Sequence, residues 1–503
     1  MFLSICGILR GHVSAKTGSA PVSPRSFPRF LGSSVLLIPL ALTCGALNPR
    51  VAAAWSSDPN SNDAVVTATG DQSAVQILGD GSGGSIMAWQ DSRNGSNLDI
   101  YAQRFNAAGV AQWATNGVAL CTATGDQSVP FLTSDGSGGA IVTFQDARNG
   151  NNDIYVQRVS NAGATLWTAN GIVICTATGD QTSPRITTDG LSGAIITWSD
   201  TRSVTSNDIY AQRVDSGATT QWAANGIAVC VAANNQEDAL ITSNGSGGAI
   251  ITWQDSRSFS YDIYAQALNS SGTPQWTANG VALCTATGNQ LLPHMCSDNA
   301  GGAIVAWQDL RSGTTEDIYT QRINNLGVVQ WTADGVALCT ATDTQLRPQA
   351  TSDGASGAIV AWQDLRSGVA EDIYAQRVNN LGAVQWTADG VAVCTATNTQ
   401  AYSQIISDGS AGALVSWVDL RNGVDYDGYI QRVNGSGVAQ WTANGVAIST
   451  ATSFQLQPVM TSDGSGGATI TWDDLRAGSF DVYASHVSGG GVLPVALTHF
   501  ALE

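Results

Sequence analysis

A segment of about 55 residues repeats eight times along this chain of 503 residues. Its clearest marker is an aromatic residue in phrases such as GGAIVAWQDLRSG, which recurs at intervals of 54 or 55 residues. These aromatic residues are Trp89, Phe144, Trp198, Trp253, Trp307, Trp362, Trp417 and Trp472. A second aromatic series, in phrases such as QWTANGVALCTAT, begins at Trp55 and keeps the same spacing from Trp113 to Trp441. So regular a period indicates tandem structural units and leaves no room for a second domain.

Each unit contains four short apolar stretches separated by turns rich in Gly, Asn and Asp, residues that suit chain reversals with positive φ. The second stretch, for example residues 303–309, is apolar on both alternating faces, so we expect both faces to be buried. A four-stranded unit packed between two like units is typical of a radial array. The sequence therefore predicts an all-β fold, an eight-bladed β-propeller of four-stranded blades.

The two ends of the repeat region each lack part of a unit. The first unit is preceded by a fourth-strand stretch at residues 64–70, and the last unit ends with a third-strand stretch at residues 481–487. We expect the N-terminal strand to join the last blade and close the ring. An open array would instead carry distinct polar caps at its two ends.

Residues 1–54 contain five basic residues, no Asp or Glu, and the apolar run LGSSVLLIPLALTCGAL. This composition resembles a secretory leader that is cleaved before Trp55. Pro39 and Gly45 make the run too short for a membrane span, and a lipoprotein attached through Cys44 is a weaker alternative. The sequence thus predicts a secreted or cell-surface protein with a leader at 1–54, a propeller at 55–488 and a tail at 489–503.

Acidic residues outnumber basic ones by 39 to 21. This balance argues against nucleic acid as a partner. We expect a monomer with no stable membrane span once the leader is removed, and a glycan or a protein as its partner.

Two sets of polar residues recur in almost every unit. The first is the trio Asp91, Arg93 and Asp99 and its equivalents, for which we expect a bidentate bridge that pins the loop between the second and third strands. Calcium bound by the clustered acids is the alternative, and no other cofactor is expected. The second set is a cysteine on the fourth strand, expected to be a buried free thiol. These cysteines are Cys121, Cys175, Cys230, Cys284, Cys339 and Cys394.

Function is expected where units depart from the repeat, and the departures gather on the first strand. Two arginines, Arg185 and Arg347, fall outside the repeated positions, and both lie four or six residues before the Asp of SDG. The first strands are innermost in a propeller, so these positions should line its central channel. A lone histidine there is more often a hydrogen-bonded polar residue than a catalyst. The candidate ligand-binding residues are Arg185, Asp238, His294, Arg347, Gln349, Tyr402 and Gln404.

The phrase DGSGGAIVAWQDLRSG, followed by DIYAQRVN, resembles the propeller repeats of large exported bacterial surface proteins. This resemblance implies the fold and not the ligand. The sequence shows no acidic pair special to one or two units, no G-x-S-x-G and no sialidase-like Asp-box. We therefore expect a non-catalytic binding scaffold that presents its channel mouth to a glycan or a protein. The alternatives are a propeller-type carbohydrate-active enzyme, either a glycosidase or a lyase, and a purely structural adhesive module.

Overall fold

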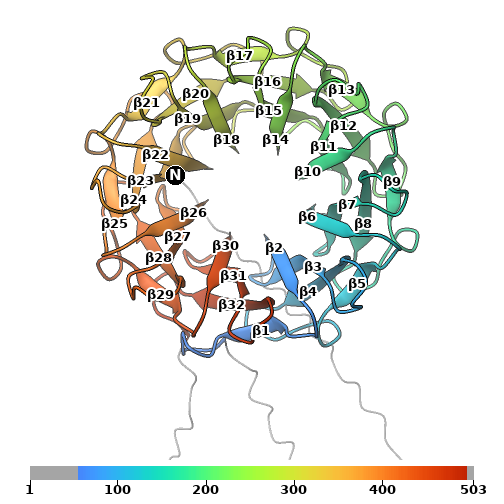
Figure 1. The fold of residues 1–503 in the computed structure, drawn as a ribbon, viewed down its shortest axis with the longest axis horizontal. Helices are drawn as coiled ribbons and strands as arrows, with labels where there is room; N and C mark the ends of the chain where they lie inside the picture. The colour runs from blue at the N-terminus through green and yellow to red at the C-terminus, as the bar shows by residue number, and fades with distance from the viewer. Residues whose placement is uncertain (1–54, 495–503) are drawn as a thin grey trace, which may run out of the picture. The chain divides into compact units, whose positions relative to one another are not determined.

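The computed structural model describes residues 55–494, which form eight four-stranded antiparallel sheets arranged as a ring around a common axis (Figure 1). This confirms the eight-bladed β-propeller. The expected leader, residues 1–54, and residues 495–503 of the expected tail lie outside the described residues. No helix in the described part of the chain is long and apolar enough to cross a membrane.

Blades 1 to 8 are numbered in chain order, and each begins with its strand nearest the axis. These innermost strands are β2 (Gln72–Gly79), β6 (Gln127–Ser134), β10 (Gln181–Thr188), β14 (Gln236–Ser243), β18 (Gln290–Ser297), β22 (Gln345–Ser352), β26 (Gln400–Ser407) and β30 (Gln455–Ser462). The second strands are β3 (Ser85–Asp91), β7 (Ala140–Asp146), β11 (Ala194–Asp200), β15 (Ala249–Asp255), β19 (Ala303–Asp309), β23 (Ala358–Asp364), β27 (Ala413–Asp419) and β31 (Ala468–Asp474).

The two outer strands of each blade follow in the same order. The third strands are β4 (Asp99–Phe105), β8 (Asp153–Val159), β12 (Asp208–Val214), β16 (Asp262–Leu268), β20 (Asp317–Ile323), β24 (Asp372–Val378), β28 (Asp427–Val433) and β32 (Asp481–Val487). The fourth strands are β5 (Val118–Cys121), β9 (Ile172–Cys175), β13 (Ile227–Cys230), β17 (Val281–Cys284), β21 (Val336–Cys339), β25 (Val391–Cys394), β29 (Val446–Ser449) and, for blade 8, β1 (Asp63–Val66).

The hydrophobic core lies between successive blades. All seven residues of β19 are buried, because blade 4 covers one face of the sheet and blade 6 covers the other. Trp307 faces blade 4, while Ile304 packs with Trp362 of blade 6. This burial of both faces matches the expectation from the doubly apolar second strand.

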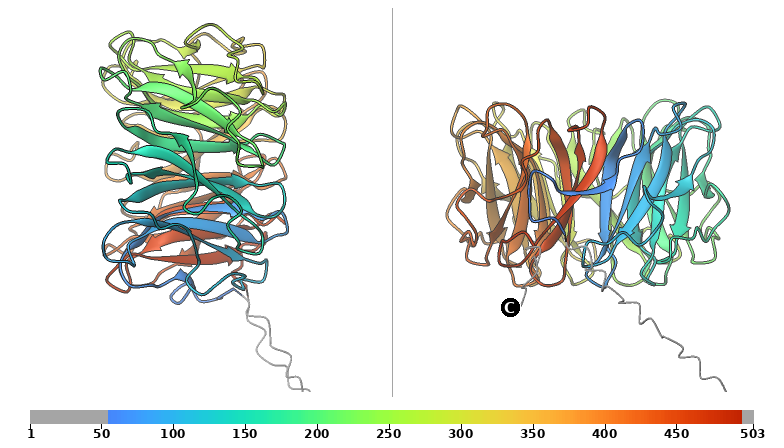
Figure 2. Two further views of the ribbon diagram at one scale, coloured as in Figure 1. Left: turned by 90° about the vertical axis from the view of Figure 1, so that its right-hand side faces the viewer. Right: turned by 90° about the horizontal axis from the view of Figure 1, so that it is seen from below.

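Closure of the ring joins the two ends of the repeat region. Strand β1 pairs antiparallel with β32, and Figure 2 shows the blue β1 beside the red strands of blade 8. Trp55, just before β1, is buried and donates from Nε1 to the backbone oxygen of Ala107 in blade 1 at 3.2 Å. Trp113 makes the equivalent bond to Asn161 in the next blade. The N-terminal segment therefore supplies the parts that blade 8 lacks.

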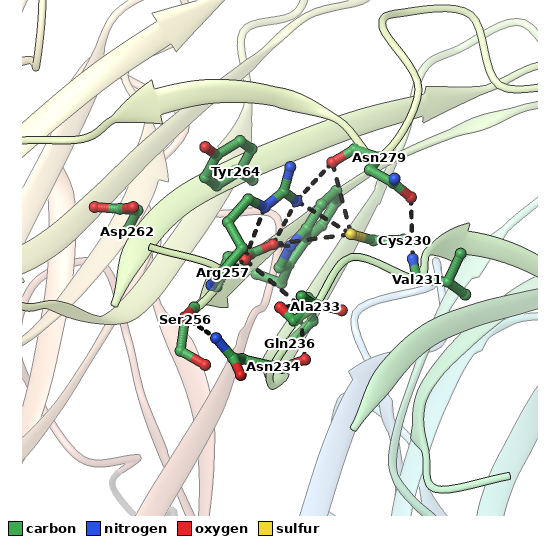
Figure 3. A network of polar contacts seen from close by, with 12 residues as sticks. Cys230, Val231, Ala233, Asn234, Gln236, Ser256, Arg257, Asp262, Tyr264 and Asn279 are labelled. Carbon is green, nitrogen blue, oxygen red and sulfur yellow. Dashed lines mark hydrogen bonds and ion pairs between the residues drawn. The ribbon is translucent and has the colours of Figure 1, made fainter. Parts of the chain in front are cut away.

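A repeated cluster of charged and aromatic side chains holds the loop between the second and third strands of each blade. Figure 3 shows this cluster in blade 4. In blade 4, Arg257 donates from Nε to Asp255 at 2.9 Å and from Nη2 to the backbone oxygen of Asn279 at 2.8 Å. Its guanidinium carbon lies 3.9 Å from the ring centroid of Tyr264. The bridge is bidentate as expected, but it joins the end of the second strand to its own loop. Asp262, on the third strand, bonds instead to Ser258.

The seven cysteines in residues 55–494 are free thiols, and the six on the fourth strands are buried. Burial is the main cause that raises the pKa of Cys230 to about 12, so its thiol stays protonated and unreactive at neutral pH. The sulfur accepts a hydrogen bond from Nη2 of Arg257 at 3.2 Å. These thiols therefore belong to the structural cluster.

Candidate functional site

Every innermost strand carries a β-bulge at the position six residues before the Asp of SDG. In β10, for example, the pairing with β11 shifts register between Thr182 and Arg185. The bulge residues all have φ between 49° and 54°, which is the left-handed region. They are Ala74, Val129, Ser183, Asp238, Leu292, Arg347, Tyr402 and Gln457. A bulge re-aims side chains, and strained residues often gather at functional sites.

Glutamines of the preceding blades support several of these bulges. The backbone N–H of Tyr402 donates to Gln363 Oε1 at 2.9 Å, and that of Leu292 donates to Gln254 Oε1 at 3.1 Å. At the closure between blades 8 and 1, Asp473 replaces the glutamine and accepts from the N–H of Ala74 at 2.9 Å. Each bond fixes a channel-lining strand to the blade beside it.

The innermost strands enclose a cavity of about 700 Å³. Six of the seven residues proposed from the sequence line this cavity: Arg185, His294, Arg347, Gln349, Tyr402 and Gln404. The seventh, Asp238, lines an adjoining cavity of about 200 Å³ that shares Arg185, His294, Arg347 and Gln349 with the first. These side chains come from strands of blades 3 to 7, which follow one another around the ring (Figure 1).

Arg185 is the most unusual charge in the cavity. Its guanidinium carbon lies 3.9 Å from the ring centroid of Phe131, and Nη1 donates to the backbone oxygen of Pro184 at 3.0 Å. Burial lowers its pKa to about 10, although the charge of Asp238 acts in the opposite direction. Removal from water disfavours a cation that has no counter-ion in contact. A bound anion would therefore stabilise the charge of Arg185.

Arginines elsewhere in the described residues are paired differently. Of the sixteen arginines in residues 55–494, fourteen lie within 4.0 Å of a carboxylate, and the two exceptions are Arg185 and Arg347. Both exceptions line the cavity. Two unneutralised cations in one concave site favour a negatively charged ligand.

His294 lies two blades from Arg185 across Leu240. Its Nδ1 accepts a hydrogen bond from the backbone N–H of Ala350 on β22 at 3.0 Å. Burial, assisted by the charge of Arg185, lowers the pKa of His294 to about 4, so the ring is neutral at neutral pH. A neutral ring that accepts at Nδ1 carries its proton on Nε2. His294 is thus a hydrogen-bond donor toward a ligand, and not a base.

Arg347 and Tyr402 are the more exposed of the candidate residues that line the cavity. Both side chains are exposed, and the guanidinium carbon of Arg347 lies 5.1 Å from the ring centroid of Tyr402. Burial raises the pKa of nearby Glu371, while a hydrogen bond from Gln363 and the charge of Arg347 oppose that rise. Glu371 therefore contributes a partly buried carboxylate outside the cavity.

Within residues 55–494 no group of three or more His, Cys, Asp or Glu side chains is arranged to hold a metal ion. The repeated Asp and Arg instead bond to each other, as in Asp255 and Arg257.

Two features of the site were missed by reasoning from the sequence. The bulges were missed because their left-handed residues are not glycines, although prolines follow five of them. Proline within a strand marks an edge or a bulge, so that signal was present. The aromatic Phe454 was also missed. It occupies a position that is polar in the other seven units, from Asp71 to Thr399.

No protein-family model matches the chain, and neither does any curated protein. Solved structures do match its fold. An ulvan lyase bound to a GlcA–Rha3S polymer has a TM-score of 0.44 and 12% identity, and the match covers 77% of this chain and 96% of that chain. An α-L-arabinanase from Penicillium chrysogenum has a TM-score of 0.35 and 14% identity, over 62% of this chain and 94% of that one. An α-L-arabinofuranosidase from Fusarium graminearum has a TM-score of 0.34 and 10% identity, over the same two fractions.

These similar structures contradict the expectation of a non-catalytic binding scaffold, since they are carbohydrate-active enzymes and favour the enzyme alternative. The expectation was wrong because it relied on finding a catalytic motif within one unit, whereas a propeller cavity gathers single residues from several blades. At these identities and TM-scores the likeness shows the fold alone. Substrate and chemistry must therefore be argued from the residues of this chain.

Proposed function

We propose that this protein is a carbohydrate-active enzyme, a lyase that cleaves an acidic polysaccharide in its channel cavity. The observation that carries the proposal is Arg185, a partly buried guanidinium without a carboxylate in contact, in a cavity that also holds Arg347. The carboxylate of a uronate sugar is an anion of the size and geometry that a guanidinium binds in a bidentate manner.

The composition of the lining favours elimination over hydrolysis. Hydrolysis of glycosides commonly uses two carboxyl groups on either side of the scissile bond. The two cavities offer one carboxylate, Asp238, together with cations, amides and a tyrosine. β-Elimination needs a cation to neutralise the uronate carboxylate, a base for the proton on C5, and an acid for the leaving oxygen.

Each of these roles has a candidate. Arg185 holds the uronate carboxylate and stabilises the charge that develops on it. Asp238 removes the C5 proton, the C4–O4 bond breaks, and a C4=C5 double bond forms. Tyr402, whose side chain lines the larger cavity together with Arg185, donates its hydroxyl proton to the departing O4. His294 hydrogen-bonds to a substrate oxygen through Nε2.

The pH dependence follows from Asp238. Burial raises its pKa above the usual range, the neighbouring Glu237 raises it further, and Arg185 opposes both. The base must be deprotonated, so cleavage should be lost as the pH falls through this raised pKa and should reach a plateau above it.

The test is to incubate the purified protein with polygalacturonate, alginate and ulvan and to follow ultraviolet absorbance. A C4=C5 double bond conjugated to the carboxylate absorbs, whereas hydrolysis yields reducing ends without that absorbance. Asp238→Asn should abolish the signal. Asp343→Asn is the matched control, because Asp343 is exposed and lines neither cavity. Reducing ends without absorbance, or an active Asp238→Asn variant, would contradict the proposal.

A further inference from the structure

Outside the residues that line the two cavities, two aromatic side chains from neighbouring blades contact each other. Tyr426 precedes β28 of blade 7, and Phe454 precedes β30 of blade 8. Their ring centroids lie 6.2 Å apart at an interplanar angle of 48°. Phe454 is 38% exposed, and Tyr426 is partly exposed. Exposed aromatic groups that touch each other are a feature of binding surfaces.

In several other blades, the residue equivalent to Phe454 is polar and links its own blade to the preceding one by a hydrogen bond. There an Asp or Asn accepts a hydrogen bond from the backbone N–H of the preceding blade's loop, as Asp126 does from Leu98 at 2.9 Å. Phenylalanine cannot accept this bond.

Blade 7 compensates for the loss of this bond. Asp425, next to Tyr426, accepts a hydrogen bond from the backbone N–H of Ser453 at 2.7 Å. The acid that links the two loops therefore belongs to blade 7 here, and not to the following blade. Asn422 donates to Asp425 at 2.6 Å and holds it in place. The loops stay joined while an aromatic ring replaces a polar side chain at the surface.

The aromatic pair is connected to the cavity through strand β30. The backbone N–H of Gln455, the first residue of β30, donates to the backbone oxygen of Tyr426 at 2.8 Å, and Gln457 on the same strand lines the cavity. The pair Tyr426 and Phe454 therefore lies at the start of a strand that lines the cavity.

We propose that Tyr426 and Phe454 form an aromatic subsite that stacks against a sugar ring on the leaving-group side of the uronate held by Arg185. The apolar C–H face of a pyranose covers an aromatic ring, while its hydroxyl groups remain free for the polar neighbour Glu371. The substrate is thus an extended chain of several sugars rather than a single unit or a disaccharide. This inference rests on the proposed function for the identity of the anionic sugar.

The proposal is tested by electrophoresis of the whole protein through gels that contain polygalacturonate, alginate or ulvan. Phe454→Ala and Tyr426→Ala should each weaken retardation about tenfold, and Phe454→Trp should restore it. Phe259→Ala is the control, since Phe259 is an aromatic residue of the blade 4 loop that is 93% exposed and lines neither cavity. On the cleaved polymer, kcat/KM should fall by the same factor, while cleavage of the shortest substrate should stay unchanged.

The outcomes separate this proposal from the proposed function. Retardation that depends on Phe454 and Tyr426 without any cleavage supports the subsite and overturns the lyase. Cleavage with equal retardation of all variants overturns the subsite and leaves the lyase. A wild-type protein that none of the three polymers retards overturns the subsite as well.

Discussion

Arginine has opposite roles in two regions of the molecule, the loops between the second and third strands and the innermost strands around the channel. In blade 6, Arg366 lies in the loop between β23 and β24 and bonds to Asp364, whose side chain is fully buried. Its guanidinium carbon lies 3.8 Å from the ring centroid of Tyr374. On β22 of the same blade, Arg347 faces the cavity, and on β10 Arg185 is partly buried there without a carboxylate in contact. Where arginine is neutralised by its own chain it stabilises the fold, and where it is not it is available to a ligand.

The largest expected effect comes from removing the unneutralised charge. Arg185→Met keeps much of the side-chain volume but loses the cation that binds the developing negative charge. We expect kcat/KM on the cleaved polymer to fall by about 100-fold or more, as when a charge-stabilising donor is lost. Kinetics with saturating and dilute polymer measure this, and a loss below threefold would remove Arg185 from the active site.

Removing an arginine that is paired with a carboxylate should lower stability and leave the cleavage rate unchanged. Arg366→Ala leaves Asp364 buried without its ionic partner, which costs about 3 kcal/mol in the free energy of unfolding. Chemical denaturation measures that cost. Below its own unfolding transition the variant should cleave polymer at the wild-type rate. An active-site defect as large as its stability defect would erase the distinction between the two regions. Arg347→Ala, in the same blade, should show wild-type stability and impaired cleavage.

The smallest effect is expected at the closure of the ring. Burial raises the pKa of Asp473 to about 7, against the opposing hydrogen bonds from Ala74 and Val75. The folded state then binds this proton more tightly than the unfolded state, so stability is full below about pH 4 and declines as the pH rises toward 7. Asp473→Gln introduces the residue found at the equivalent position between blades 6 and 7, where Gln363 accepts the hydrogen bond. This variant should have a melting temperature a few degrees higher at pH 8 and an unchanged one at pH 4. Equal melting temperatures at pH 8 would contradict this.

The fold could be predicted almost completely from the sequence, because most structural features appear in six to eight units. Repetition exposes the fully apolar second strand, seen in β19, and the cysteine of the fourth strand, seen in Cys230. The missing pieces at the two ends even predict the pairing of β1 with β32.

The site was only partly predictable, because it consists of the positions that do not repeat. Arg185 could be found by subtracting the repeated arginines from the total. The protonation of His294 could not, since it depends on a bond from Ala350 in another blade. The role of Phe454 depends on its contact with Tyr426, which lies 28 residues away in the sequence and belongs to a different blade.

The measurement that tests the central claim most directly is the free energy of unfolding of Arg185→Met in the absence of any ligand. Arg185 is partly buried and makes no ion pair within 4.0 Å, so the variant should be as stable as the wild type or more stable, while its cleavage of polymer is lost. A loss of several kcal/mol, like that expected for Arg366→Ala, would show that Arg185 is structural and would contradict the assignment of the cavity as the active site.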